Sequence, residues 1–143
     1  MHRSSLHGLA AAAYRSAETE PPVLQVALLC ARAVEHLEAA KAAIATRRVE
    51  ARFERVMQAH AIVGGLQACL DFRHGGEIAP LLDRLYGYML GRLTQINLRK
   101  DPAICEELIG LLGRMRSSWA EIAAGTPASQ PPLRPDLAAT VSA

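Results

Sequence analysis

Apolar residues recur every three or four positions along four long stretches of the chain, with polar residues between them. This spacing places the apolar side chains on one face of a helix. The pattern predicts helices over residues 22–46, 49–72, 76–100 and 102 to about 122. Each helix would be roughly 33–37 Å long, and the connections span only a few residues. Short connections favour antiparallel neighbours, so the sequence predicts an all-α fold, an antiparallel up-down-up-down four-helix bundle.

Three local signals refine the helix boundaries. Asp101 followed by Pro102 is the strongest start signal, because the carboxylate can cap the helix and proline suits its first turn. The run His74-Gly75-Gly76 predicts a stop, since glycine adopts the left-handed conformation that ends helices. Gly64 and Gly65 interrupt the second helix. Two interior glycines lower the stability of a helix by about 2 kcal/mol relative to alanine. Either packing compensates for this loss or the helix bends there.

The chain divides into three parts. Residues 1–18 are expected to form a flexible N-terminal arm, with an alanine run that ends at Tyr14. Residues 19–124 are expected to form the bundle, which at this length is a single domain. Residues 125–143 hold four of the eight prolines together with Ser, Thr and Gln, a composition typical of a disordered tail.

Composition narrows the class of protein further. The chain is 50% hydrophobic but only 4% aromatic, which disfavours β-sandwiches and β-barrels. The net charge of +2 is too balanced to indicate a nucleic-acid or anionic-membrane partner. Arg47, Arg48, Arg52 and Arg55 mark the corner between the first two helices, where cations suit the negative end of the first helix. Without interleaved aromatic residues, these arginines do not indicate a nucleic-acid site.

No stretch approaches the roughly 18 apolar residues that a membrane helix needs. The apolar run at residues 9–13 is shorter than the core of a signal peptide. We therefore expect no membrane insertion and a cytosolic location.

Candidate metal and thiol chemistry is sparse. A di-iron bundle needs Glu-x-x-His pairs, and neither this motif nor His-x-x-x-His occurs. His60 falls on an apolar stripe, where a core or boundary histidine is the more common case. Cys30, Cys69 and Cys105 lie far apart without a C-x-x-C pair, so we expect buried reduced thiols. No metal and no cofactor is predicted.

Catalytic motifs are not evident either. The sequence has neither a glycine-rich phosphate loop nor a G-x-S-x-G motif. Glu106 and Glu107 stand in the first turns of the fourth helix, where acidic residues are favoured by the helix dipole. We expect the chain not to be an enzyme.

The third helix is more apolar than a bundle requires. Its apolar arc over residues 78–96 covers about 200°, whereas a surface helix needs roughly 100–140°. The residues that widen the arc are Tyr86, Leu90 and Leu93 on one side and Leu81 and Tyr88 on the other. Two interpretations stay open. Neighbouring helices or a homodimer could absorb both flanks, or one flank could form a groove for a partner helix.

An ordered set of motifs resembles the flagellar secretion chaperone family FliS. The central pieces are Gly75-Gly76-Glu77-Ile78-Ala79, Leu85-Tyr86-Gly87-Tyr88-Met89, Arg92-Leu93 and Asn97, with Leu70-Asp71-Phe72 before them. Leu111-Leu112, Arg116, Trp119 and Ile122 match near the end, and Ala13-Tyr14, Thr19 and Pro22 near the start. The resemblance covers residues 12–123. The chain departs from the family pattern at Leu29-Cys30-Ala31-Arg32 and at Glu20-Pro21.

The resemblance implies a binding protein with a four-helix bundle fold. Members of the family bind the disordered C-terminal segment of flagellin in the cytoplasm, hold it unpolymerised and help deliver it to the flagellar type III export apparatus. The alternative is a helical-bundle adaptor or regulatory dimer of another system, which would ignore flagellin.

A hypothesis for the flagellin-binding groove follows from the wide arc. The groove would include Tyr86, Leu90 and Leu93, with Met57 and Ile62 of the second helix as neighbours. The resemblance adds Tyr14, which would dock near the groove and rearrange when flagellin binds. The alternatives are that Tyr86 and Leu93 are ordinary core residues and that Tyr14 belongs to a tethered arm.

Overall fold

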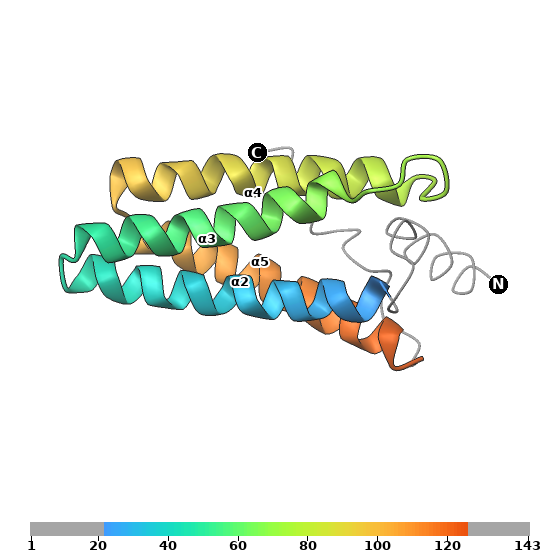
Figure 1. The fold of residues 1–143 in the computed structure, drawn as a ribbon, viewed down its shortest axis with the longest axis horizontal. Helices are drawn as coiled ribbons and strands as arrows, with labels where there is room; N and C mark the ends of the chain where they lie inside the picture. Colours follow the sequence, from blue (N-terminus) through green and yellow to red (C-terminus); the bar gives the residue numbers. More distant parts are fainter. Residues whose placement is uncertain (1–21, 126–143) are drawn as a thin grey trace.

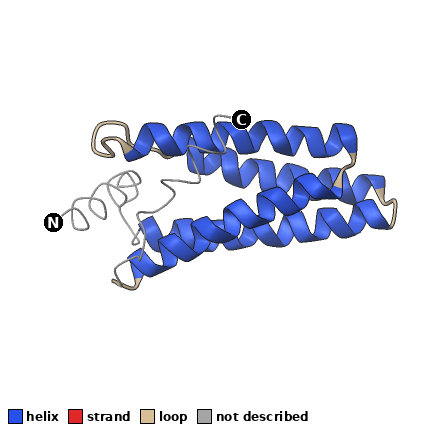
Figure 2. Cartoon of the chain, turned by 180° about the vertical axis from the view of Figure 1, so that it is seen from behind, coloured by secondary structure: helices blue, strands red, loops and turns tan. Residues whose placement is uncertain are grey.

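The computed structural model describes residues 22–125, and this range contains four helices and no strand (Figures 1 and 2). The helices are α2 (Pro22–Ala45), α3 (Val49–Ala68), α4 (Ile78–Arg99) and α5 (Pro102–Ala123). The predicted all-α four-helix bundle is confirmed. The predicted arm (1–18) and tail lie outside the described residues, apart from Gly125.

The helices are arranged in a ring of antiparallel neighbours. Helix α2 packs against α3 and α5, and α4 packs against the same two helices, so α2 and α4 are diagonal (Figure 1). The packing of α2 on α5 is the most extensive, and that of α4 on α5 is the least. Small residues on α2 contribute to this extensive packing. Ala33 and Ala40 are fully buried, and their short side chains let a neighbouring helix approach.

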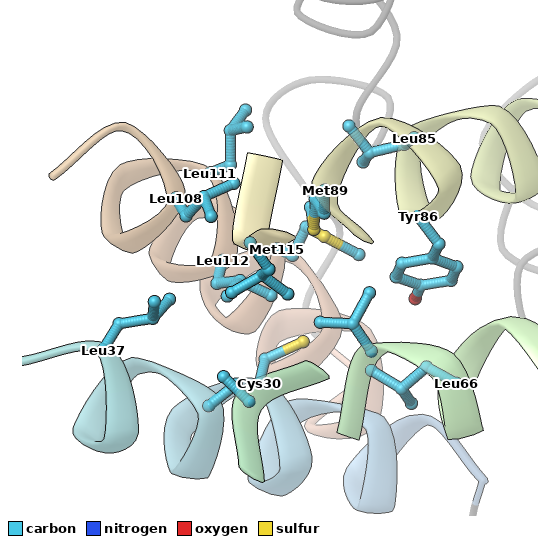
Figure 3. Packing of buried hydrophobic residues seen from close by; sticks show 14 of the residues in the cluster. Cys30, Leu37, Leu66, Leu85, Tyr86, Met89, Leu108, Leu111, Leu112 and Met115 are labelled. Atoms are coloured by element: carbon cyan, nitrogen blue, oxygen red, sulfur yellow. The ribbon is translucent and has the colours of Figure 1, made fainter. Parts of the chain in front are cut away.

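The core is continuous along the bundle. Figure 3 shows Cys30 and Leu37 of α2, Met89 of α4 and Met115 of α5 turned toward a shared interior. Trp119 near the end of α5 is also fully buried, and it is the largest buried side chain. All four helices therefore contribute to one core.

Helix boundaries follow local hydrogen bonding. The Asp101 carboxylate accepts a hydrogen bond from the Ala103 amide at 2.9 Å, with Pro102 as the first helical residue, as predicted. Helix α3 ends at Ala68, four residues before the predicted end. The reason lies in Asp71, whose Oδ1 accepts from the backbone amides of Arg73 (2.9 Å) and His74 (3.2 Å). This turn competes with helical hydrogen bonding.

Within residues 22–125, two non-glycine residues adopt the left-handed conformation, and both follow helix ends. Arg47 (φ 55°) comes after α2, and Lys100 (φ 53°) closes α4. Glycine is the usual residue at such positions, since a side chain costs about 1–2 kcal/mol there. The α2–α3 and α4–α5 connections lie at the same end of the bundle (Figure 1).

The two glycines inside α3 do not end the helix, which runs through both of them. A Cβ atom added at Gly64 or Gly65 would meet no other side chain or element within 4 Å. The packing that could have compensated for these glycines is therefore missing from the described residues.

Candidate partner-binding surface

Helix α3 carries a row of exposed apolar side chains. Val49, Phe53 and Met57 are 57%, 53% and 43% exposed. They are spaced by four residues and so lie on one face of the helix. We call these three residues the outer row. Exposed apolar side chains that gather in one place indicate an interaction site more than scattered ones do.

The outer row runs along the flank of α3 that faces α4. Gln67 lies five full turns after Val49 and thus at the same angle around the helix. Its side-chain amide donates to the backbone oxygen and Oδ1 of Asp83 in α4, at 3.2 and 3.1 Å. Nearer the other end, Arg52 Nε donates to Asn97 Oδ1 at 3.2 Å. These contacts define the antiparallel register of the two helices, which puts Met57 about level with Arg92 and Leu93 of α4.

Helix α4 adds small and apolar residues on its outward side. Leu98 is highly exposed, Leu90 is half-buried against the core, and Gly87 and Gly91 are exposed. A Cβ atom at Gly91 would meet no atom of residues 22–125 within 4 Å, apart from its own helix. We group these residues with the outer row and Gly64 of α3 and call the set the α3–α4 face.

The structure separates the predicted groove residues of α4. Leu90 lies at the edge of the α3–α4 face, but Tyr86 and Leu93 are fully buried. Figure 3 shows the Tyr86 ring inside the bundle, on the side of Leu66 of α3. For Tyr86 and Leu93 the structure therefore shows the core interpretation, and these two side chains offer no surface to a partner in this conformation.

Met57 and Ile62, the two groove residues predicted on α3, do not lie on the same side of the helix. Met57 belongs to the outer row. Ile62 follows five residues later, about 140° around the helix, and is partly buried against the core. It lies close in angle to Arg55, whose Nη1 donates to His36 Nδ1 of α2 at 3.1 Å. Met57 and Ile62 thus stand on opposite flanks of α3. Tyr14 lies outside the described residues.

The sequence prediction missed part of this surface. None of Val49, Phe53 and Leu98 was predicted from the sequence to be a surface residue. A helical projection of residues 49–68 separates two apolar rows, and the row that includes Phe53 could have been recognised from it. Other exposed large apolar residues are Leu24, Leu28 and Phe72.

The acidic pair of α5 is divided between two neighbouring helices. Glu106 pairs with Lys41 of α2 at 2.8 Å. Glu107 pairs with Arg92 of α4 at 2.8 Å and also accepts a hydrogen bond from the Tyr88 hydroxyl. Both carboxylates tie helices together, which explains their presence without a catalytic role.

The thiols differ in their surroundings. Burial raises the pKa of Cys30 to about 12 and that of Cys105 to about 11. Both groups stay protonated and unreactive near neutral pH. Cys69, after the end of α3, is exposed, so the prediction of three buried thiols is wrong for this residue. Within residues 22–125, no group of three His, Cys, Asp or Glu side chains could hold a metal ion.

Among the helices of residues 22–125, none combines the length and the hydropathy that crossing a membrane requires.

Comparison with known proteins places the chain in a family. Residues 7–126 match the family model described as flagellar protein FliS. The flagellar secretion chaperone FliS of Vibrio cholerae is 35% identical over 97 residues, 68% of this chain and 71% of the relative. FliSB of Pseudomonas aeruginosa is 35% identical over 94 residues (66% and 75%), and FliS of Salmonella typhimurium is 45% identical over 75 residues (52% and 56%). The chain belongs to the FliS family of flagellar secretion chaperones.

Proposed function

We propose that this protein is a cytosolic chaperone that binds the disordered C-terminal segment of flagellin, keeps it from polymerising and assists its delivery to the flagellar type III export apparatus. Catalysis and a cofactor play no part in this function. The proposal rests on family membership and on one structural observation, the outer row of α3.

The α3–α4 face suits an amphipathic segment. Such a segment can lay its apolar side chains on Phe53, Met57 and Leu90, and its backbone can come close where Gly64 and Gly91 carry no side chain. A segment that folds on binding loses chain entropy, which offsets part of the contact energy. The complex would then stay dissociable, as delivery to an export apparatus requires.

The other predicted residues take secondary parts in this proposal. Tyr86 and Leu93 lie in the core beside Leu90 and would support the face from below. Ile62, on the far flank, would be reached only by a segment that crosses α3. Tyr14 would dock near the face and rearrange when flagellin binds.

Calorimetric titration with flagellin from the same cell tests the proposal. We expect one-to-one binding with a negative heat-capacity change, and we expect it to vanish when flagellin lacks its C-terminal segment. Met57→Asp should weaken binding at least about tenfold, because a carboxylate would have to be desolvated at the centre of the contact. Leu90→Asp tests the α4 side of the face in the same way.

Gln58→Asp is the matched control, since it introduces the same charge one residue away on an exposed position of α3. It should leave binding within about twofold of the parent. Flagellin that binds equally well with and without its C-terminal segment would contradict the proposal. A dimer that Met57→Asp converts to a monomer, with no flagellin binding, would instead favour the adaptor or regulatory dimer.

A further inference from the structure

One charged side chain is buried without a carboxylate partner. Arg52 of α3 is only 8% exposed, and it is the one charged residue buried in the described part of the chain. Its Nε donates to the neutral Asn97 amide oxygen at 3.2 Å. The ion pairs found among residues 22–125 are Lys41–Glu106, His74–Asp71 and Arg92–Glu107, and none involves Arg52. A buried charge is ordinarily paired, because removing it from water is costly.

Arg52 lines a pocket of about 390 Å³ together with three more cations. Arg47, Arg48 and Lys100 share the lining, and Ile44 and Val49 supply apolar walls. Among the described residues that line the pocket, none is acidic. The long aliphatic stem of an arginine accounts for some burial, but it does not explain why four cations are among the residues that line one pocket.

These cations are not needed to complete the helix ends. After α2, the Arg47 amide donates to the Ile44 oxygen at 3.2 Å and the Arg48 amide donates to the Ala43 oxygen at 2.9 Å. After α4, the Lys100 amide donates to the Ile96 oxygen at 2.8 Å. Backbone groups thus cap both ends. The side chains of Arg47 and Lys100 extend from left-handed positions where glycine would suit the backbone better.

The pocket also includes the start of α3. Val49 is the first residue of this helix, and the preceding Arg48 makes no side-chain capping hydrogen bond. The first amides of a helix lack partners within the helix, and they lie at the positive end of its dipole. They therefore add to the positive potential that the four cations create.

We propose that this pocket is a binding site for a phosphoryl oxyanion, either inorganic phosphate or the phosphate group of a small organic monoester. Arginine forks bind phosphate oxygens in a bidentate manner, and a doubly charged anion matches a pocket of four cations better than a single carboxylate does. Bound phosphate would supply the counter-charge that Arg52 lacks. The site shares Val49 with the α3–α4 face, but it does not depend on the proposed chaperone function.

Thermal unfolding and calorimetry with inorganic phosphate, at ionic strength matched by sodium chloride, test the site. We expect a saturable rise in Tm with phosphate, since a ligand that binds the folded state stabilises it. Arg47→Gly removes a pocket cation at a position whose backbone suits glycine, so the variant should fold while its phosphate affinity falls at least about tenfold. Arg52→Met should abolish the phosphate-dependent rise.

Arg84→Gln is the matched control, because it removes one exposed positive charge from α4 outside the pocket. Its phosphate response should equal that of the parent. Glycerol phosphate identifies the source of the anion: tighter binding than phosphate indicates an organic monoester, equal binding indicates the free anion, and both support the site. A phosphate effect that is not saturable, or that is the same in Arg47→Gly as in the parent, would overturn the proposal.

Discussion

The two apolar rows of helix α3 differ in how much of their side chains is exposed. The inward row consists of Val56, Ala59, Val63 and Leu66, which are at most 3% exposed. The outer row contains Phe53, which is larger than any of these, and Met57, and both are about half-exposed. A helix selected only for folding would place its bulkier apolar residues inside, because burial of apolar area stabilises the fold. The stability of the bundle alone does not explain the exposure of the outer row, which fits the binding role proposed above.

The glycines of α3 support the same interpretation. Gly64 and Gly65 weaken the helix, and in the described part of the chain no side chain or neighbouring element comes within 4 Å of the added Cβ positions. Their presence lowers stability without any gain in internal packing. An approaching partner backbone is a physical reason for leaving this part of the surface bare.

The largest expected effect tests the contrast between inside and outside on α4, where two leucines stand five residues apart. Leu93→Ala should lower the free energy of unfolding by about 2–5 kcal/mol, because Leu93 is fully buried and its truncation leaves a cavity. Leu98→Ala should change it by less than about 0.5 kcal/mol, since Leu98 is 75% exposed. Urea titration of both variants measures the difference. Equal losses would show that a second copy of the chain buries Leu98.

The next largest effect is a change of about 1 kcal/mol in the free energy of unfolding. It comes from a variant that should alter stability and binding in opposite directions. Gly64→Ala should raise the free energy of unfolding by this amount, because alanine favours the helix and the new methyl group meets no neighbour. The same methyl group should weaken flagellin binding by hindering the partner backbone. Urea titration and calorimetry on the same sample check both statements.

Gly113→Ala in α5 is its control. A Cβ atom at Gly113 also meets nothing within 4 Å, and Gly113 is not part of the α3–α4 face. It should give the same stabilisation without a loss of affinity. If both variants bind flagellin as the parent does, no partner backbone approaches Gly64.

Much of the fold could be predicted from the sequence because its determinants are local. The start of α5 depends on Asp101 and Pro102, which act within one turn, and both were recognised. The predicted end of α3 was wrong, because side-chain hydrogen bonds of Asp71 favour a turn there and the spacing of apolar residues does not describe them. The bundle itself follows from the spacing of apolar residues and the short connections.

The candidate surface was harder to predict, because exposure depends on where neighbouring helices lie. Periodicity showed that the apolar arc of α4 is wide, but it could not show that Tyr86 and Leu93 face inward while Leu90 stays at the edge. The same limit applied to Phe53, which has core spacing along the chain and yet is exposed. Buried and exposed apolar residues can be told apart only when the placement of α3 against α4 is known. The contacts Arg52–Asn97 and Gln67–Asp83 report this placement.

The smallest expected effect concerns the other flank of α3, where Arg55 Nη1 donates to His36 Nδ1 of α2. Burial, followed by the charges of Arg55 and Arg32, lowers the pKa of His36 from its ordinary value of 6.5. On acidification the unfolded chain therefore takes up this proton first. The contribution of His36 to stability is constant above about pH 6.5 and declines as the pH falls below that value.

His36→Gln removes this titration, and it should flatten the decline in the free energy of unfolding between pH 7 and pH 5. The effect should be small, because the site is only partly buried and solvent screens its charges. Urea titrations of parent and variant at several pH values measure the slope. A parent that gains stability on acidification through this range, relative to the variant, would show that His36 is better protonated in the folded state. The α2 flank of α3 would then be a site of charge pairing with Glu35, the one group that raises the pKa of His36. On the present geometry, the α2 flank is instead a packed seam whose polar contact requires neutral histidine, in contrast to the open apolar flank on the side of α4.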